Sequence, residues 1–271
     1  MADFYSEGGC RISYQVHDFT DPWTQPETML LLHPAMSNAR RWFRWLPRLA
    51  RHYRVVCMEL RGHGSSQMPL PHEDFSLSLL VKDALNLLDE VGCSEAHIVG
   101  NSAGGYIAQQ LAIHHPGRVR TLALYAATPG LKNSRATSWI PRIRELGLRQ
   151  FLASTIDERF DASADPRLVA WFIEQAGAND PEFIARFVAH MCTHDFMDDL
   201  VRITAPTLIV AAGGEQIGHA DTYLEMQQRI RDSRLVYLRT SGHNIGDGFP
   251  DACVDALLGF LQPQGSPEAT T

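Results

Sequence analysis

Short apolar runs alternate with longer amphipathic stretches along most of this 271-residue chain, and this pattern constrains the fold more than any other feature. Six runs have the length and composition of buried strands: residues 29–32, 54–58, 96–99, 121–125, 207–211 and 235–238. Apolar residues at helical spacing predict helices over residues 42–50, 78–91, 103–114, 222–230 and 251–261. Such alternation is typical of strand–helix–strand crossovers, so we expect an α/β fold with a mainly parallel, buried sheet.

Two parts of the chain depart from the alternation. Near the start, two half-alternating segments flank Gly8-Gly9, which predicts an antiparallel hairpin with a two-residue turn. Over residues 131–204 we find helical patterns but no strand pattern, which predicts a helical insertion. The core would then comprise residues 1–130 and 205–262, and the Pro-, Gly-, Ser- and Thr-containing residues 263–271 would form a disordered tail.

Charge and composition narrow the range of partners. The formal net charge is −7 and no run of Lys or Arg exceeds two, which argues against binding to nucleic acid. No apolar stretch approaches the roughly 18 residues that span a bilayer, and the start of the chain lacks the order of a signal peptide. Five scattered cysteines suit free thiols in a reducing compartment. We therefore expect a cytoplasmic protein without nucleic-acid or membrane partners; homo-oligomer formation stays open.

A serine between glycines follows one of the predicted strands. Residues 100–105 have the sequence Gly-Asn-Ser-Ala-Gly-Gly, directly after the apolar run 96–99 and at the start of a predicted helix. A serine hydroxyl is a poor nucleophile unless it is exposed beside a base, and a tight strand-to-helix turn with small neighbours provides that exposure. Backbone N–H groups at the helix start can stabilise an oxyanion there. This pattern predicts Ser102 as a nucleophile and the Ala103 N–H as an oxyanion donor.

With this motif the chain resembles the α/β-hydrolase superfamily over nearly its whole length. The Arg-Gly-His-Gly-Ser-Ser turn at residues 61–66 is similar to a frequent turn of that superfamily. Asn101 and Gly105 resemble the elbow of hydrolases that open ring-cleavage diketones, while residues 40–42 and 83–89 are similar to enol-lactone hydrolases. The resemblance implies an α/β-hydrolase fold: a mostly parallel eight-stranded sheet, helices on both faces, and a helical lid inserted into the core.

The resemblance also implies where the serine's partners lie, since the chain order on this fold is serine, acid, histidine. His243, in a late Ser-Gly-His motif after the last predicted strand, would be the general base. The usual aspartate after the strand at 207–211 is absent, and Glu215 occupies the matching place. A carboxylate one methylene longer can orient the imidazole, so Glu215 is the expected acid, with Asp221 and Asp195 as alternatives.

A second oxyanion donor should come from the loop after the first parallel strand. Here His33-Pro34-Ala35 replaces the superfamily's usual His-Gly-x. Because proline has no N–H, the resemblance implies that Ala35 is the donor.

Several residues of the predicted insertion could be mistaken for ligand-binding groups. His190 and His194 stand four apart on an expected helix, but the glutamate of a zinc-binding H-E-x-x-H motif is missing, which favours a coincidence of spacing. Aromatic residues at helical spacing usually serve cores, and arginines usually lie in solvent. We therefore favour packing, with the lining of a pocket beneath the insertion as the alternative, for Trp139, Trp171, Phe172, Phe183, Phe187 and Met191. We favour a surface position, with contact to a carboxylate on the substrate as the alternative, for Arg135, Arg142, Arg144 and Arg149.

Together these features favour hydrolysis of a small-molecule carboxylic ester or lactone through an acyl-enzyme on Ser102, with His243 as base and no cofactor. Two alternatives stay open. One is carbon–carbon bond hydrolysis of a ring-fission diketone acid on the same triad, suggested by Asn101 and Gly105. The other is a non-catalytic or slow-turnover ligand-binding receptor on the same fold. The sequence does not identify the substrate.

Overall fold

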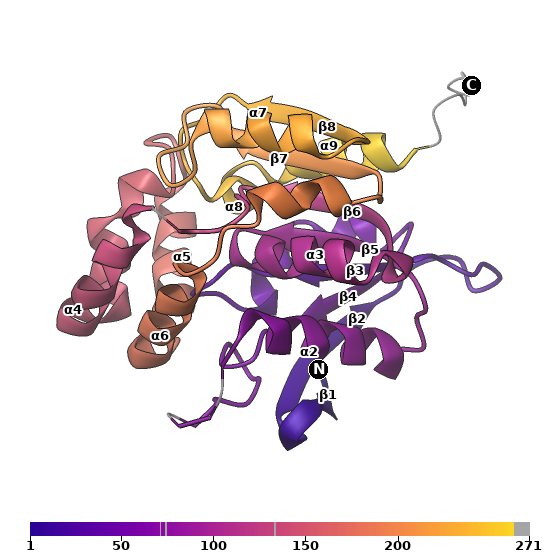
Figure 1. Cartoon of the computed structure of the whole chain (residues 1–271), viewed down its shortest axis with the longest axis horizontal. Helices are drawn as coiled ribbons and strands as arrows, with labels where there is room; N and C mark the ends of the chain where they lie inside the picture. Colours follow the sequence, from indigo (N-terminus) through magenta and orange to yellow (C-terminus); the bar gives the residue numbers. More distant parts are fainter. Residues whose placement is uncertain (71, 74, 133, 263–271) are drawn as a thin grey trace.

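An eight-stranded sheet forms the centre of the molecule in the computed structural model, which describes residues 1–70, 72–73, 75–132 and 134–262 (Figure 1). The strand order is β1-β2-β4-β3-β5-β6-β7-β8. Strands β3 to β8 run parallel, and β1 and β2 are antiparallel at one edge. The strands are β1 (Ala2–Tyr5), β2 (Arg11–His17), β3 (Thr28–Leu32), β4 (Arg54–Met58), β5 (Ala96–Asn101), β6 (Val119–Tyr125), β7 (Thr207–Ala212) and β8 (Ser233–Leu238). The six predicted parallel strands are confirmed.

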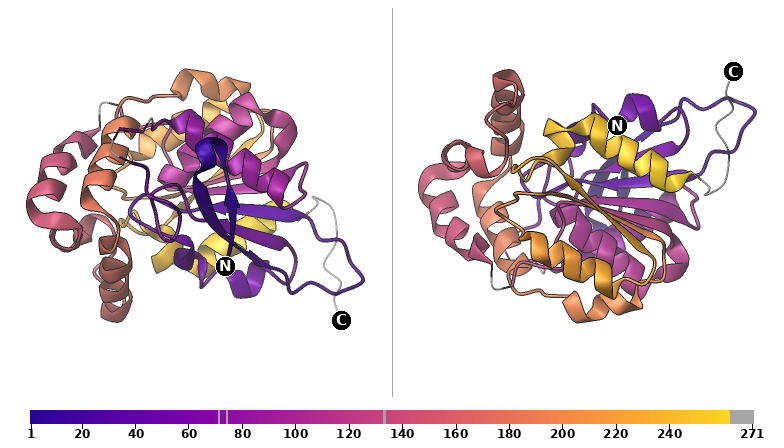
Figure 2. Two further views of the ribbon diagram at one scale, coloured as in Figure 1. Left: turned by 90° about the horizontal axis from the view of Figure 1, so that it is seen from below. Right: turned by 90° about the horizontal axis from the view of Figure 1, so that it is seen from above.

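Helices cover both faces of the sheet, so both faces are buried (Figure 2). Alternate side chains of a strand point to opposite faces: Leu30 and Leu32 enter one apolar cluster, and Met29 and Leu31 enter the other. This double burial explains why the strands are continuous apolar runs. The first cluster includes α2 (Leu77–Glu90), α3 (Ala103–His114) and α7 (Ala220–Arg229); the second includes α1 (Leu46–Leu49), α8 (Ile245–Gly248) and α9 (Pro250–Leu261).

Two local predictions are wrong. The hairpin between β1 and β2 is present, but its loop spans residues 6–10 and contains the 3-10 turn η1 (Glu7–Gly9) rather than a two-residue turn. The Ser6 N–H closes this loop by donating to the Cys10 carbonyl at 2.9 Å. The helix expected over residues 42–50 is reduced to η2 (Ala39–Trp42) and the single turn α1, since Pro47 is compatible only with a first helical turn.

Helices occupy the chain between β6 and β7, and no strand lies within the described residues of 131–204. They are α4 (Trp139–Ser154), α5 (Pro166–Gly177) and α6 (Pro181–Met191), with η4 (Arg135–Ser138), η5 (Ile156–Glu158) and η6 (Met197–Arg202) as shorter segments. Asp165 and Asp180 cap α5 and α6, each followed by a proline at the first helical position. The three α-helices gather at one end of the sheet (Figure 1).

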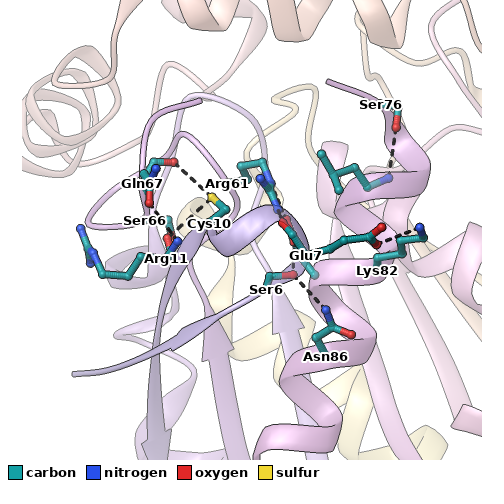
Figure 3. A network of polar contacts seen from close by, with 12 residues as sticks. Ser6, Glu7, Cys10, Arg11, Arg61, Ser66, Gln67, Ser76, Lys82 and Asn86 are labelled. Carbon is teal, nitrogen blue, oxygen red and sulfur yellow. Dashed lines mark hydrogen bonds and ion pairs between the residues drawn. The ribbon is translucent and has the colours of Figure 1, made fainter. Parts of the chain in front are cut away.

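A buried polar network fastens the N-terminal hairpin to α2 (Figure 3). The Arg61 guanidinium donates to the Asp83 carboxylate at 2.7 and 2.8 Å, and both side chains are buried. Ser6 donates its hydroxyl proton to Asp83 and accepts from Asn86 at 3.0 Å. Each buried charge thus has a partner, as burial requires. Through Arg61, the Arg-Gly-His-Gly-Ser-Ser turn of the sequence thus helps to hold the hairpin against α2.

In the described part of the chain, no helix combines the length and apolar character that crossing a membrane requires. The predicted disordered tail, residues 263–271, lies outside the described residues.

Candidate active site

Ser102 lies at a sharp turn between β5 and α3. Its φ of 47° places it in the left-handed region, where residues other than glycine are strained. Neighbouring chain comes so close that side chains are excluded at two positions: a Cβ on Gly104 would lie 2.1 Å from the Leu32 carbonyl oxygen, and one on Gly100 would lie 2.6 Å from that of Gly104. The glycines of the motif therefore let the turn pack against β3 while Ser102 remains partly exposed.

Ser102, His243 and Glu215 meet at the carboxyl ends of β5, β8 and β7. The Ser102 Oγ is 2.9 Å from the His243 Nε2, and the His243 Nδ1 is hydrogen-bonded to the Glu215 Oε1. A carboxylate only accepts hydrogen bonds, so the Nδ1 carries the proton and the Nε2 is left to accept from the serine. The structure thus brings these three sequence-predicted residues into one continuous relay.

The Glu215 side chain is fully buried and has two further donors. The Gly218 N–H donates to its Oε1 at 3.0 Å, and the Tyr223 hydroxyl donates to its Oε2 at 2.6 Å. Burial, together with the charge of Glu215, raises the pKa of Tyr223 well above its usual value, so Tyr223 keeps its proton. These donors compensate for the loss of water around a buried carboxylate. Sequence analysis missed Tyr223, because nothing in the α7 pattern distinguishes it from a packing residue.

Neither alternative carboxylate contacts His243. Asp195 is exposed and accepts the Met197 N–H at 3.1 Å, and Asp221 is exposed in the first turn of α7. Within the described residues, Glu215 supplies the carboxylate that His243 contacts.

Ala35 and Ala103 lie on the wall of the same cavity as Ser102. The loop that carries Ala35 is fixed by the buried His33 ring, whose Nε2 accepts the Leu60 N–H at 3.0 Å. We find no protein acceptor for the N–H of Ala35 or Ala103 among the described residues. Two free N–H groups therefore border the cavity beside the serine.

The cavity above Ser102 is small and mostly apolar, with a volume of about 60 Å³. Side chains from α4, α5 and α6 form much of its wall, so these helices cover the carboxyl ends of the strands. The residues that line it are Pro34, Ala35, Met36, Arg41, Ser102, Ala103, Tyr106, Leu131, Trp139, Leu152, Arg159, Phe172, Phe187, Val188, Met191, Ile217, His243 and Asn244. Of the six apolar residues named in the sequence of the insertion, Trp139, Phe172, Phe187 and Met191 line this cavity, which was the alternative to packing alone, whereas Trp171 and Phe183 do not line it.

Two buried arginines on this wall were missed in the sequence. Arg41 is paired with the carboxylate of Asp247 and lies 4.8 Å from the centre of the Phe172 ring. Arg159 is only 5% exposed and lies against the rings of Trp139 and Phe151, 5.6 Å from each centre. Burial is the main cause that lowers the pKa of Arg159, to about 10, so its guanidinium stays charged at neutral pH.

The four arginines singled out in the sequence lie outside the cavity wall. Arg142 is half-buried and donates to the Ser154 hydroxyl at 2.9 Å, while the other three form exposed or partly exposed ion pairs. Those pairs are Arg135 with Glu158, Arg144 with Glu182, and Arg149 with Glu174. Their interpretation as surface residues agrees with this placement.

His190 and His194 do not share a helix, contrary to prediction, because α6 ends at Met191. Their Nε2 atoms lie 3.0 Å apart, and the His190 Nε2 also accepts the Leu77 N–H at 2.8 Å. No group of three potential metal ligands occurs in the described part of the chain.

We compared the chain with known proteins, since Ser102, His243 and the buried Glu215 meet at the carboxyl ends of parallel strands. Residues 27–248 match the family described as the alpha/beta hydrolase fold. The chain belongs to this family. It is 25% identical over 263 residues to the pimeloyl-(acyl-carrier protein) methyl ester esterase of Nitrosospira multiformis, with 92% of this chain and 99% of that protein covered.

One further relative and one solved structure of similar fold are named as enol-lactonases. The chain is 27% identical over 228 residues to 3-oxoadipate enol-lactonase 1 of Acinetobacter baylyi, which covers 80% of this chain and 83% of that protein. The solved structure of the enol-lactonase from Burkholderia xenovorans superposes with a TM-score of 0.88 at 21% identity, covering 96% of this chain and 99% of that one. At this identity the second likeness shows a shared fold.

Proposed function

We propose that this protein is a serine hydrolase that cleaves a small-molecule carboxylic ester or lactone. The observation that carries the proposal is the continuous hydrogen-bonded relay from the Ser102 Oγ through His243 to the buried Glu215. An imidazole held by a carboxylate on one side and a serine hydroxyl on the other is the arrangement that activates serine for attack on an acyl group. Two relatives, one named as a methyl ester esterase and one as an enol-lactonase, support this reaction class.

In the proposed reaction the His243 Nε2 takes the hydroxyl proton as the Ser102 Oγ bonds to the carbonyl carbon of the substrate. The N–H groups of Ala35 and Ala103 receive the negative charge that develops on the carbonyl oxygen. His243 then passes the proton to the departing alkoxide, which leaves an acyl group on Ser102. A water molecule gives a proton to His243 and attacks the acyl carbon. The bond between that carbon and the Ser102 Oγ then breaks, His243 returns the proton to the Oγ, and the carboxylic acid leaves. Throughout, Glu215 stabilises the charged imidazole.

The small apolar cavity favours a short or compact substrate, because side chains of α4, α5 and α6 close over the serine. We propose that these helices act as a lid. No step of the mechanism calls for a cofactor.

The test is hydrolysis of a panel of short-chain aryl esters and five- and six-membered lactones by the purified protein and by its Ser102→Ala variant. We expect turnover by the wild type and a loss of at least about 10³-fold in the variant, the scale of removing a triad nucleophile. The matched control is Ser241→Ala, which removes a partly buried hydroxyl two residues before His243 and should retain activity.

Covalent labelling separates the rival functions. A fluorophosphonate probe should attach to Ser102, as located by peptide mass spectrometry, and should not label Ser102→Ala. A protein that binds ligands but neither reacts with the probe nor hydrolyses esters would be a receptor. Strong preference for a ring-fission dienoate over every ester and lactone would instead establish carbon–carbon bond hydrolysis and overturn the proposal.

A further inference from the structure

Arg159 differs from the other buried arginines of the described chain. Three arginines are buried, namely Arg41, Arg61 and Arg159. Arg41 is paired with Asp247, and Arg61 is paired with Asp83. For the Arg159 guanidinium we find neither an ion pair nor a hydrogen bond within the described residues. The adjacent carboxylate, Glu158, forms its ion pair with Arg135 at 3.1 Å. Its charge still favours the charged form of Arg159, but the two side chains form no ion pair or hydrogen bond with each other.

The aromatic rings beside Arg159 do not replace a partner. Trp139 and Phe151 each lie 5.6 Å from its guanidinium carbon, a distance at which ring faces attract a cation. A guanidinium nevertheless has five N–H donors in its plane, and ring faces do not satisfy such in-plane donors. A buried charge is costly unless it is both paired and hydrogen-bonded. Arg159 therefore lacks a partner that a bound molecule could supply.

Asn244 provides a second, independent observation at the same place. Its Nδ2 is buried and has no hydrogen-bond acceptor, and its side chain lines the cavity together with Arg159 and Ser102. Backbone hydrogen bonds hold the two segments together: the Asn244 N–H donates to the Arg159 carbonyl at 2.9 Å, and the His243 N–H donates to the Glu158 carbonyl at 3.1 Å. Two unsatisfied donor groups thus border the cavity next to His243.

The chemistry of these groups points to an anion with one negative charge. Arg159 offers only N–H donors, and the unpartnered atom of Asn244 is its Nδ2, also a donor. The remaining cation of the wall, Arg41, is neutralised by Asp247. A planar guanidinium matches the two oxygens of a carboxylate, which can also accept from the Asn244 amide. A phosphate dianion would need more charge than one free arginine supplies. The mostly apolar remainder of the wall suits a hydrocarbon segment.

We propose that Arg159 and Asn244 bind a carboxylate group of the substrate, so that the enzyme acts on esters or lactones that carry a free carboxylate away from the reacting carbonyl. This inference rests on the proposed function, since Ser102 must act on that carbonyl. Arg159 is then a specificity-determining residue.

The test compares esters that differ in charge alone. The anionic series is the monomethyl esters of succinic, glutaric and adipic acids; the neutral series is methyl butanoate, pentanoate and hexanoate, in which a methyl group replaces the carboxylate. We expect the wild type to favour the best anionic ester by about tenfold or more in kcat/KM. In Arg159→Met this ester should lose about 30-fold or more, as when one partner of a buried charge pair is truncated, while the neutral esters change less than threefold.

The matched control is Arg142→Met. Arg142 lies 5.4 Å from the centre of the same Phe151 ring, is half-buried, and is absent from the cavity wall. We expect this variant to keep the preference of the wild type. Arg159→Lys, which retains the charge without the planar fork, should retain part of it.

Binding of free glutarate, measured by calorimetry and by thermal shift, makes the inference independent of turnover. Glutarate should stabilise the wild type and not Arg159→Met. If both ester series are hydrolysed without preference and Arg159→Met affects them equally, the carboxylate site is refuted while the hydrolase proposal stands. If no ester is hydrolysed but glutarate binds through Arg159, the hydrolase proposal fails and the anion site stands. If no ester is hydrolysed and glutarate does not bind, both the hydrolase proposal and the carboxylate site are refuted.

Discussion

Replacing Glu215 with Gln tests the part of the relay that departs from the usual aspartate. The amide has the same shape as the carboxylate, so its oxygen can still accept from the His243 Nδ1–H and the Gly218 N–H, while the Tyr223 hydroxyl turns to accept from the new NH₂ group. What disappears is the negative charge that stabilises the imidazolium in the transition state. The carboxylate also holds the imidazole in the tautomer whose Nε2 accepts the serine proton. In serine-protease triads the change from carboxylate to amide keeps the geometry but loses this tautomer, and kcat falls by about 10⁴, or about 5.4 kcal/mol at 1.36 kcal/mol for each factor of ten.

Because the local geometry is retained, we expect Glu215→Gln to lower kcat on an aryl ester by about 10³–10⁴ while KM changes little. The melting temperature should shift by less than about 3 °C, since a chain of this size shifts about 2–4 °C per kcal/mol and few contacts are lost. Release of 4-nitrophenol from its ester, followed continuously or at fixed times, gives kcat and KM. The control is Glu225→Gln, an exposed residue paired with Arg229. A folded Glu215→Gln variant that loses less than tenfold in kcat would refute the role assigned to Glu215.

Three further perturbations follow from the structure. Tyr223→Phe removes the donor to the Glu215 Oε2 and should lower the free energy of unfolding by about 1.5–3 kcal/mol in urea titrations, the value of a hydrogen bond to a charged group; an unchanged midpoint would contradict this. Burial lowers the pKa of His63 to about 4, so between pH 6.5 and 4 the unfolded chain binds the extra proton and stability falls as pH falls. The wild type should therefore lose about 2 kcal/mol more than His63→Asn between pH 7 and 5. Gly104→Ala should cost about 1–3 kcal/mol or more, whereas Gly117→Ala, with no atom within 4 Å of the new Cβ, should cost little; equal losses in the two variants would argue against the close packing of the elbow.

The central strands could be predicted because β3, β4, β5 and β7 are buried almost throughout and therefore appear as continuous apolar runs. The runs at β3, β4 and β7 begin and end within one residue of the observed strands. The local turns were harder to predict. A residue type such as glycine allows several backbone conformations, so it does not determine which turn forms. Gly8 and Gly9 both adopt positive φ values, as a two-residue turn would also require, yet here they belong to a 3-10 turn closed by Ser6 and Cys10.

Ser102, His243 and Glu215 could be predicted from the sequence because each follows a recognisable strand. Each also lies in a motif or at the position of the superfamily's usual aspartate. Ser102 and His243 stand in glycine-containing motifs, and Glu215 follows β7. The residues that donate hydrogen bonds to these three side chains could not be predicted from the sequence. Tyr223 lies eight positions after Glu215 in the chain, and only the fold of the loop before α7 directs its hydroxyl toward the carboxylate.

The buried arginines show why the proposed carboxylate site could not be derived from the sequence. Arg41 and Asp247 are 206 residues apart and Arg61 and Asp83 are 22 apart, so no local pattern distinguishes a paired arginine from an unpaired one. Arg142 lies within α4 and Arg159 directly follows η5, and of these two arginines only Arg159 is buried in the cavity wall. A buried cation without a partner destabilises the free protein, and an anion bound there would offset that cost. Arg159→Met should therefore melt at a higher temperature than the ligand-free wild type, because it removes an unpaired charge from an apolar wall. Arg61→Met should melt at a lower temperature, because it leaves Asp83 buried without its partner.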